Sequence, residues 1–204
     1  MFGKNNNKHL EKPSIFAGIL LFICPIYYSP VYAKPKNNLT HSISKYTLDN
    51  GLKVIIREDH RSPMVMTQIW YTVGSSDESG NQLGISHALE HMMFKGTTRV
   101  PNDEFTRLSR LYGGSVNAAT FTNYTNYYQL YQKDFLALAL ELEADRMSNL
   151  LLRQQDFDTE IKVVMEERRQ KTDDNPRALA SERFKWVSYP TSHYRQPVIG
   201  YMKN

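Results

Sequence analysis

Two histidines four residues apart constrain this chain more than any other sequence feature. His87 and His91 flank Glu90 in the sequence His-Ala-Leu-Glu-His. Residues at positions i and i+4 of an α-helix project from one face, so both imidazoles can hold the same metal ion if this segment is helical. Glu90 follows His87 by three residues and lies on the same side. The motif therefore predicts a helix here and a fold that brings a further ligand to it.

The order of these residues also indicates a chemistry. His-x-x-Glu-His is the reversed form of the zinc-peptidase motif His-Glu-x-x-His. Zinc lowers the pKa of a bound water, and a carboxylate beside it takes the proton as that water attacks a carbonyl group. The alternative is a pair of solvent-facing histidines on an exposed helix. A glycine-rich loop before the motif and the apolar Met92, Met93 and Phe94 after it favour the metal site.

A catalytic zinc needs a third protein ligand and one open position. The only cysteine, Cys24, lies in a segment that we expect to be removed, so a carboxylate is the natural candidate. The predicted helix after Asp156 carries Glu160 and Glu167, which are seven residues apart and share one face. Glu166 points elsewhere. The spacing leaves both Glu160 and Glu167 as candidates.

Residues 1–33 resemble a bacterial signal peptide. Three lysines precede an apolar stretch at 15–24, and Pro25 ends that stretch. The segment finishes with Val31-Tyr32-Ala33, whose small final residue is typical of a signal-peptidase cleavage site. We therefore expect a periplasmic or secreted protein. The alternative is an uncleaved membrane anchor, and contact with a membrane is expected only in that case.

The charge balance gives no case for nucleic acid as a partner. The formal net charge is +4, and Lys4, Lys8 and Lys12 against Glu11 account for half of it within residues 1–33. The rest of the chain is nearly neutral. Hydrophobic residues make up 41% of the sequence, which is typical of a globular protein with a core.

The pattern of the remaining chain predicts strands and helices in alternation. Residues 34–45 are polar and predict a flexible lead-in, and Asn50-Gly51 predicts a β-hairpin at 46–57. Residues 64–73 are apolar on both faces, as in a central strand. Further strands are expected at 115–121 and 124–132, and helices at 101–112, 134–152, 156–171 and 177–187. This order favours a single α/β or α+β domain with helices packed against a sheet.

Beyond the motif, the chain resembles the N-terminal domain of the pitrilysin/insulinase family of zinc peptidases, the inverzincins, which include proteins like the mitochondrial processing peptidase. The resemblance covers nearly all of residues 46–204. It is carried by Gly84-Ile-Ser-His-Ala-Leu-Glu-His-Met-Met-Phe-Lys-Gly96, by the hairpin at Asn50, by Gly113-Gly-Ser-Val-Asn-Ala-x-Thr120 and by the helix from Glu160 to Glu167.

The resemblance implies roles for individual residues. His87, His91 and Glu167 would bind one zinc ion per chain, and Glu90 would be the general base. Glu160 would be an outer carboxylate that steadies the site. Asn117 and Ala118 would lie along the bound peptide substrate, although a solvent-facing polar strand residue is an alternative for Asn117. The fold implied is α+β, a largely antiparallel sheet with helices on one face.

The resemblance also implies an incomplete chamber. Family members enclose the peptide between homologous halves, and we expect the domain at 46–204 to be truncated at its C-terminal end. A second homologous half or subunit would complete the chamber that encloses the substrate. The alternative function is therefore a truncated, inactive or partner-dependent zinc-binding homologue. A non-catalytic module usually loses the motif, and S-ribosylhomocysteine lyase needs a cysteine ligand that the mature chain lacks.

Overall fold

The computed structural model describes residues 43–102 and 104–203. The predicted signal peptide and residues 34–42 lie outside the described residues. The chain divides into two compact units, one ending at Arg57 and one beginning at Glu58, and each is described by itself. In the first unit, β1 (Ile43–Thr47) and β2 (Lys53–Arg57) form an antiparallel hairpin. The predicted hairpin is thus confirmed, with its first strand beginning at Ile43.

The second unit contains a three-stranded antiparallel sheet with the order β3-β5-β4. Its strands are β3 (Met64–Tyr71), β4 (Ser115–Thr120) and β5 (Thr125–Gln132). The prediction that residues 64–73 form a central strand is wrong: among the described residues β3 is an edge, and β5 is central. Met66 and Trp70 of β3 are 53% and 55% exposed, so the apolar residues on its second face are not covered by these elements.

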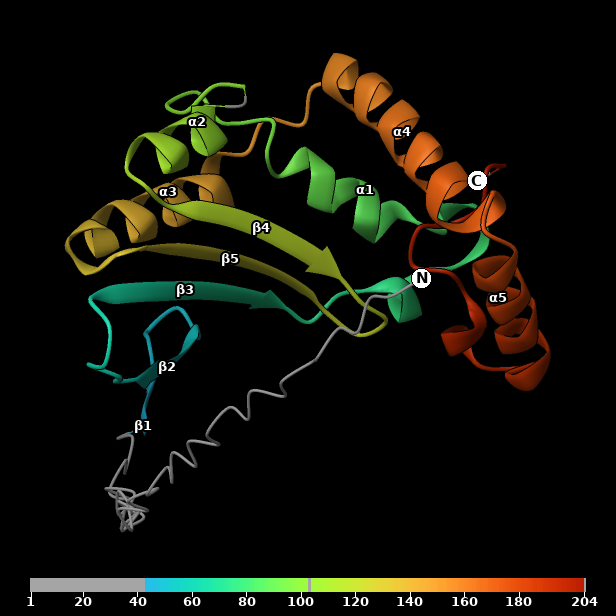
Figure 1. Cartoon of the computed structure of the whole chain (residues 1–204), viewed down its shortest axis with the longest axis horizontal. Coiled ribbons are helices and arrows are strands. Elements are labelled where there is room, and N and C mark those ends of the chain that lie inside the picture. The colour runs from blue at the N-terminus through green and yellow to red at the C-terminus, as the bar shows by residue number, and fades with distance from the viewer. Residues whose placement is uncertain (1–42, 103, 204) are drawn as a thin grey trace, which may run out of the picture. The chain divides into compact units, whose positions relative to one another are not determined.

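Helices pack on one face of this sheet, as Figure 1 shows for α1 (Ile85–Met92), α2 (Glu104–Leu111) and α3 (Leu136–Asn149). The covered face carries Tyr127 and Tyr131, which are buried. The hydroxyl groups of Tyr131 and Ser109 of α2 are 2.6 Å apart. The expected α+β class, with an antiparallel sheet and helices on one face, is confirmed.

The core beneath the sheet is organised around a buried arginine. The Arg146 guanidinium lies 4.5 Å from the ring centroid of Phe105 and 4.6 Å from that of Tyr127, at cation–π distance. Arg146 also pairs with Glu143 at 2.5 Å. These contacts tie α2, α3 and β5 together.

Two further helices follow the sheet, α4 (Gln154–Arg168) and α5 (Pro176–Ser188). Between them the backbone winds into a π-helical turn over Arg169–Asp173, so the predicted helix at 156–171 begins earlier and ends in a wider turn. The side chain of Asn175 caps α5 by accepting hydrogen bonds from the first turn. Within the described part of the chain, no helix has the length and apolar character needed to cross a membrane.

Candidate metal centre

The helix that carries the histidine motif is held at its start by a buried carboxylate. Glu78 accepts hydrogen bonds from the backbone N–H of Gly84 at 2.7 Å and of Ser86 at 2.8 Å. A carboxylate at a helix N-terminus satisfies free N–H groups and interacts favourably with the helix dipole. Gly84 itself has φ +94°, and an added Cβ would lie 2.9 Å from the carbonyl oxygen of Ile199. The start of α1 is therefore fixed from two sides.

The side chains of His87, His91 and Glu167 converge. Oε2 of Glu167 lies 3.7 Å from Nε2 of His87 and 3.4 Å from Nε2 of His91. One ligand atom from each residue lies within 4.8 Å of the other two, as residues that share a metal ion require. Two imidazole nitrogens and one carboxylate oxygen are a donor set that suits a zinc ion with an open fourth position. The residues present fit such an ion.

Glu160, the other carboxylate on the shared face of α4, lies against a different atom of the same cluster. Its Oε2 is 3.1 Å from Nδ1 of His91, and its Oε1 is 2.8 Å from Nζ of Lys95. Because a carboxylate only accepts, this contact favours the tautomer of His91 that carries its proton on Nδ1, which leaves Nε2 available to a metal. The structure thus separates the two acidic candidates that the sequence left open: Glu167 faces Nε2 of His91, and Glu160 faces Nδ1.

The electrostatic environment favours the protonation states that bind metals. Burial lowers the pKa of His87, outweighing the opposite effect of the nearby Glu90 and Glu167 charges. Burial of Glu167 acts to raise the pKa of its carboxyl, but the hydrogen bond from Lys171 and the neighbouring histidines outweigh it, so that pKa is lowered. His87 is therefore neutral and Glu167 ionised at neutral pH, the forms that coordinate a metal.

Glu90 projects into a cleft beside this cluster. The cleft is lined by the three converging residues, by Glu90, by residues 117–120 of β4 and by residues 197–199. Oε2 of Glu90 accepts a hydrogen bond from the hydroxyl of Thr120 at 2.5 Å. The carboxylate thus lies beside the metal cluster but is anchored to the sheet.

Asn117 and Ala118 lie on β4, whose second edge is unpaired among the described strands. Both residues line the cleft. The Asn117 side chain is turned back on its own strand, where its Oδ1 accepts a hydrogen bond from the Ala118 N–H at 2.9 Å. An unpaired edge next to a cleft can accept an extended peptide by strand addition.

Sequence reasoning missed several residues of the cleft. Lys171, one helical turn after Glu167, binds Oε1 of that residue at 2.5 Å, and its spacing of four residues could have indicated the pair. Residues 197–199, which follow α5 in the sequence, also line the cleft. His193, a few residues before them, lies with its Nδ1 2.7 Å from the carbonyl oxygen of Ser76.

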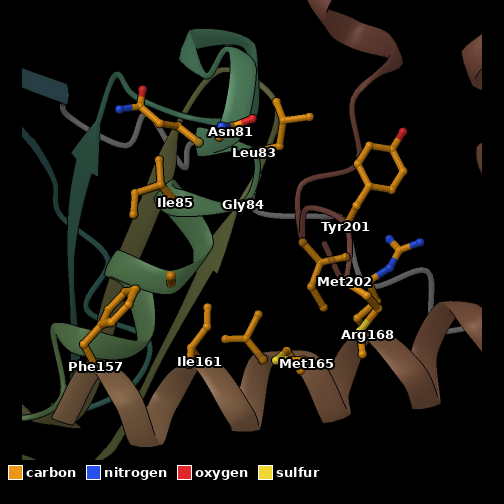
Figure 2. Close-up of a pocket in the computed structure, with 14 residues that line it drawn as sticks. Asn81, Leu83, Gly84, Ile85, Phe157, Ile161, Met165, Arg168, Tyr201 and Met202 are labelled. Carbon is orange, nitrogen blue, oxygen red and sulfur yellow. The ribbon is translucent and has the colours of Figure 1, made fainter. Parts of the chain in front are cut away.

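Arg168, next to Glu167, connects three distant segments. Its guanidinium donates to Glu182 of α5 at 3.0 Å and to the carbonyl oxygen of Gly200 at 2.7 Å. Figure 2 shows Arg168 at one end of a second, mostly apolar cavity between the start of α1, α4 and residues 199–202. These contacts hold the last turn of α4 against α5 and against the backbone at Gly200.

Comparison with known proteins places these features in one family. The sequence model of the insulinase family (peptidase family M16) matches residues 53–200. The chain is 35% identical over 157 residues to the zinc protease PqqE of Helicobacter pylori, across 76% of this chain and 35% of that protein. The chain therefore spans about a third of the length of this curated relative.

Solved structures agree with that match. The crystal structure of a protease from Helicobacter pylori superposes with a TM-score of 0.76 at 34% identity, covering 79% of this chain and 39% of that one. The first half of the periplasmic protease PqqL from Escherichia coli superposes with a TM-score of 0.71 over 78% of this chain and 36% of that one. At 24% identity, the second likeness concerns the fold alone.

Proposed function

The chain belongs to the insulinase family of peptidases (peptidase family M16), and on that premise we propose that it is a zinc-dependent endopeptidase acting on peptides or unfolded polypeptide segments. The observation that carries the proposal is the convergence of His87, His91 and Glu167 beside the carboxylate of Glu90. Zinc is supported at the level of the family by the name of the Helicobacter relative.

In this proposal the three converging residues hold one zinc ion per chain. When bound, zinc supplies a Lewis acid that polarises a carbonyl group and makes water more acidic. Glu160 keeps His91 oriented by accepting a hydrogen bond from its Nδ1–H group, and Lys171 donates a hydrogen bond to the second oxygen of Glu167. Such outer contacts fix the tautomer and direction of the ligands.

Glu90 acts as the general base. Its carboxylate takes the proton of the attacking water and passes it to the leaving amine. The peptide lies extended along β4, with backbone hydrogen bonds to the strand edge at Asn117 and Ala118. This pose places a carbonyl group between the edge strand and the metal cluster, which line the same cleft.

A second candidate function follows from the length of the match. The chain spans 35% of the Helicobacter relative, so the larger part of that protein has no counterpart in this sequence. We propose that a further homologous half or subunit completes the substrate chamber. A chain that binds zinc but cleaves peptides only with such a partner is the alternative to an independent peptidase.

The proposal is tested by zinc analysis and cleavage of an unstructured peptide with the purified chain and its Glu90→Gln variant. We expect about one zinc per chain in both proteins, as a three-ligand site implies, and cleavage only by the unmodified chain. Failure to bind zinc at neutral pH would overturn the site. Zinc binding without cleavage would favour the partner-dependent function.

We also propose that the chain is exported to the periplasm or secreted, on the evidence of residues 1–33. Cell fractionation and N-terminal sequencing of the protein from its own cell test this. A mature protein that begins near Lys34 and fractionates outside the cytoplasm is the expected result. An intact Met1 in the cytoplasm would contradict it, and an intact Met1 in the membrane fraction would indicate an anchor.

A further inference from the structure

Thr120 is the only residue for which the structure records a side-chain hydrogen bond to Glu90 within the described chain. Its Oγ1 lies 2.5 Å from Oε2 of Glu90, from a strand 30 positions further along the sequence. An ionised carboxylate has no proton to give, so the hydroxyl of Thr120 is the donor. A hydrogen bond to a charged group is shorter and stronger than one between neutral groups.

The hydroxyl of Thr120 lies beside the hydroxyl of a second threonine. Thr125, its direct cross-strand partner on β5, donates to the carbonyl oxygen of Val73 at 3.0 Å. The two threonine Oγ1 atoms are 3.4 Å apart. The backbone position of Thr120 is set by the pairing of β4 with β5.

This arrangement leaves the two oxygens of Glu90 unequal. Oε2 receives the Thr120 proton, whereas the structure shows no hydrogen bond to Oε1 from any described residue. Both Glu90 and Thr120 line the cleft beside the metal cluster. A carboxylate with one oxygen tied down presents the other in a fixed direction, which is what a general base needs to meet its proton within hydrogen-bond reach.

We propose that Thr120 is a positioning residue that holds the Glu90 carboxylate in its base orientation, so that Oε1 accepts the proton of the attacking water. The inference rests on the proposed peptidase function. It adds a link between substrate and base, because Thr120 shares β4 with Asn117 and Ala118. A peptide that pairs with this strand therefore binds beside the residue that aims the base.

The test compares Thr120→Val, which replaces the hydroxyl by a methyl group of similar size, with Thr120→Ser, which keeps the hydroxyl. On an unstructured peptide we expect the valine variant to lose about 10- to 100-fold in kcat, the scale of one hydrogen bond to a charged group. KM and zinc content should stay close to those of the unmodified chain, since no ligand atom is changed. The serine variant should recover most of kcat.

Crystal structures of the same three proteins provide a readout that does not need activity. We expect Glu90 in one conformation in the unmodified and serine proteins and displaced in the valine protein. An unmoved Glu90 in the valine protein, or an unchanged kcat, would overturn the role of Thr120. If the unmodified chain cleaves nothing, the peptidase proposal for the chain alone fails. The conformation of Glu90 then decides the role of Thr120 by itself.

Discussion

Nδ1 of His91 lies 3.1 Å from Oε2 of Glu160, while Nε2 of the same ring faces Glu167 at 3.4 Å. The imidazole is thus held between two carboxylates of one helix, α4. The two contacts differ in kind: Glu160 accepts a hydrogen bond from the ring at Nδ1, and Glu167 lies beside Nε2, the nitrogen that would bind a metal. From this difference we expect unequal effects when the two carboxylates are changed.

Replacing Glu160 should weaken zinc binding without abolishing it. Glu160→Ala removes the acceptor for the Nδ1 proton, and losing such an outer contact typically costs about 10- to 100-fold in metal affinity. Glu160→Gln keeps an acceptor oxygen and should cost less. Competition titration with a zinc chelator at neutral pH measures both values. Equal affinity in the alanine variant and the unmodified chain would show that Glu160 does not orient His91.

Replacing Glu167 should abolish stable zinc binding, and the chain offers a matched control. Glu167→Gln removes the charge of the carboxylate that faces both histidines, whereas Glu166→Gln changes an exposed neighbour whose partners are Arg169 and Gln170. We expect zinc in the Glu166→Gln protein and little or none in the Glu167→Gln protein, by elemental analysis after dialysis. Zinc lost from both, or kept by both, would contradict the assignment of Glu167.

Replacing Arg168 should destabilise the fold. Its side chain is 6% exposed and bridges α4 to Glu182 and to the backbone of Gly200. Arg168→Met leaves Glu182 with its buried partner removed, and breaking a buried pair typically costs about 3–5 kcal/mol of unfolding free energy. Arg169→Met, at an exposed pair, should cost less than about 1 kcal/mol. Urea unfolding of both proteins measures the difference, and equal midpoints would refute the bridging role.

Gly200 should tolerate a side chain less well than Gly113, although both have positive φ. An added Cβ at Gly200 would lie 2.3 Å from the carbonyl oxygen of Leu83, whereas at Gly113 it meets nothing within 4 Å. Gly113→Ala should therefore cost only the left-handed backbone penalty, about 1–2 kcal/mol. Gly200→Ala should lower the free energy of unfolding by more than this, because the backbone at Leu83, next to the start of α1, has to move away from the new methyl group. Thermal unfolding compares the two, and equal losses would mean that the approach of Leu83 and Gly200 is not needed.

Local features of the fold could be predicted because they depend on neighbouring residues. The Asn50-Gly51 turn required positive φ at its glycine, and Gly51 has φ +85°. The helix at His87 followed from the spacing of the motif and the glycine before it. The prediction that β3 is a central strand failed because local sequence says nothing about neighbouring strands. Apolar residues on both faces are a property of the strand itself, whereas its place in the sheet depends on which other strands pair with it.

The candidate site likewise has a part that the sequence predicts and a part that depends on tertiary packing. The sequence by itself determined that His87, Glu90 and His91 share one helix face, because helical geometry relates residues within one turn. Only the tertiary structure decided that Glu167 lies beside Nε2 of both histidines while Glu160 accepts a hydrogen bond from Nδ1 of His91. It also decided that Thr120 donates to Glu90 and that Gly200 packs against the start of α1. These contacts join residues far apart in the sequence. They exist only once packing has brought separate elements together, so no pattern within one element encodes them.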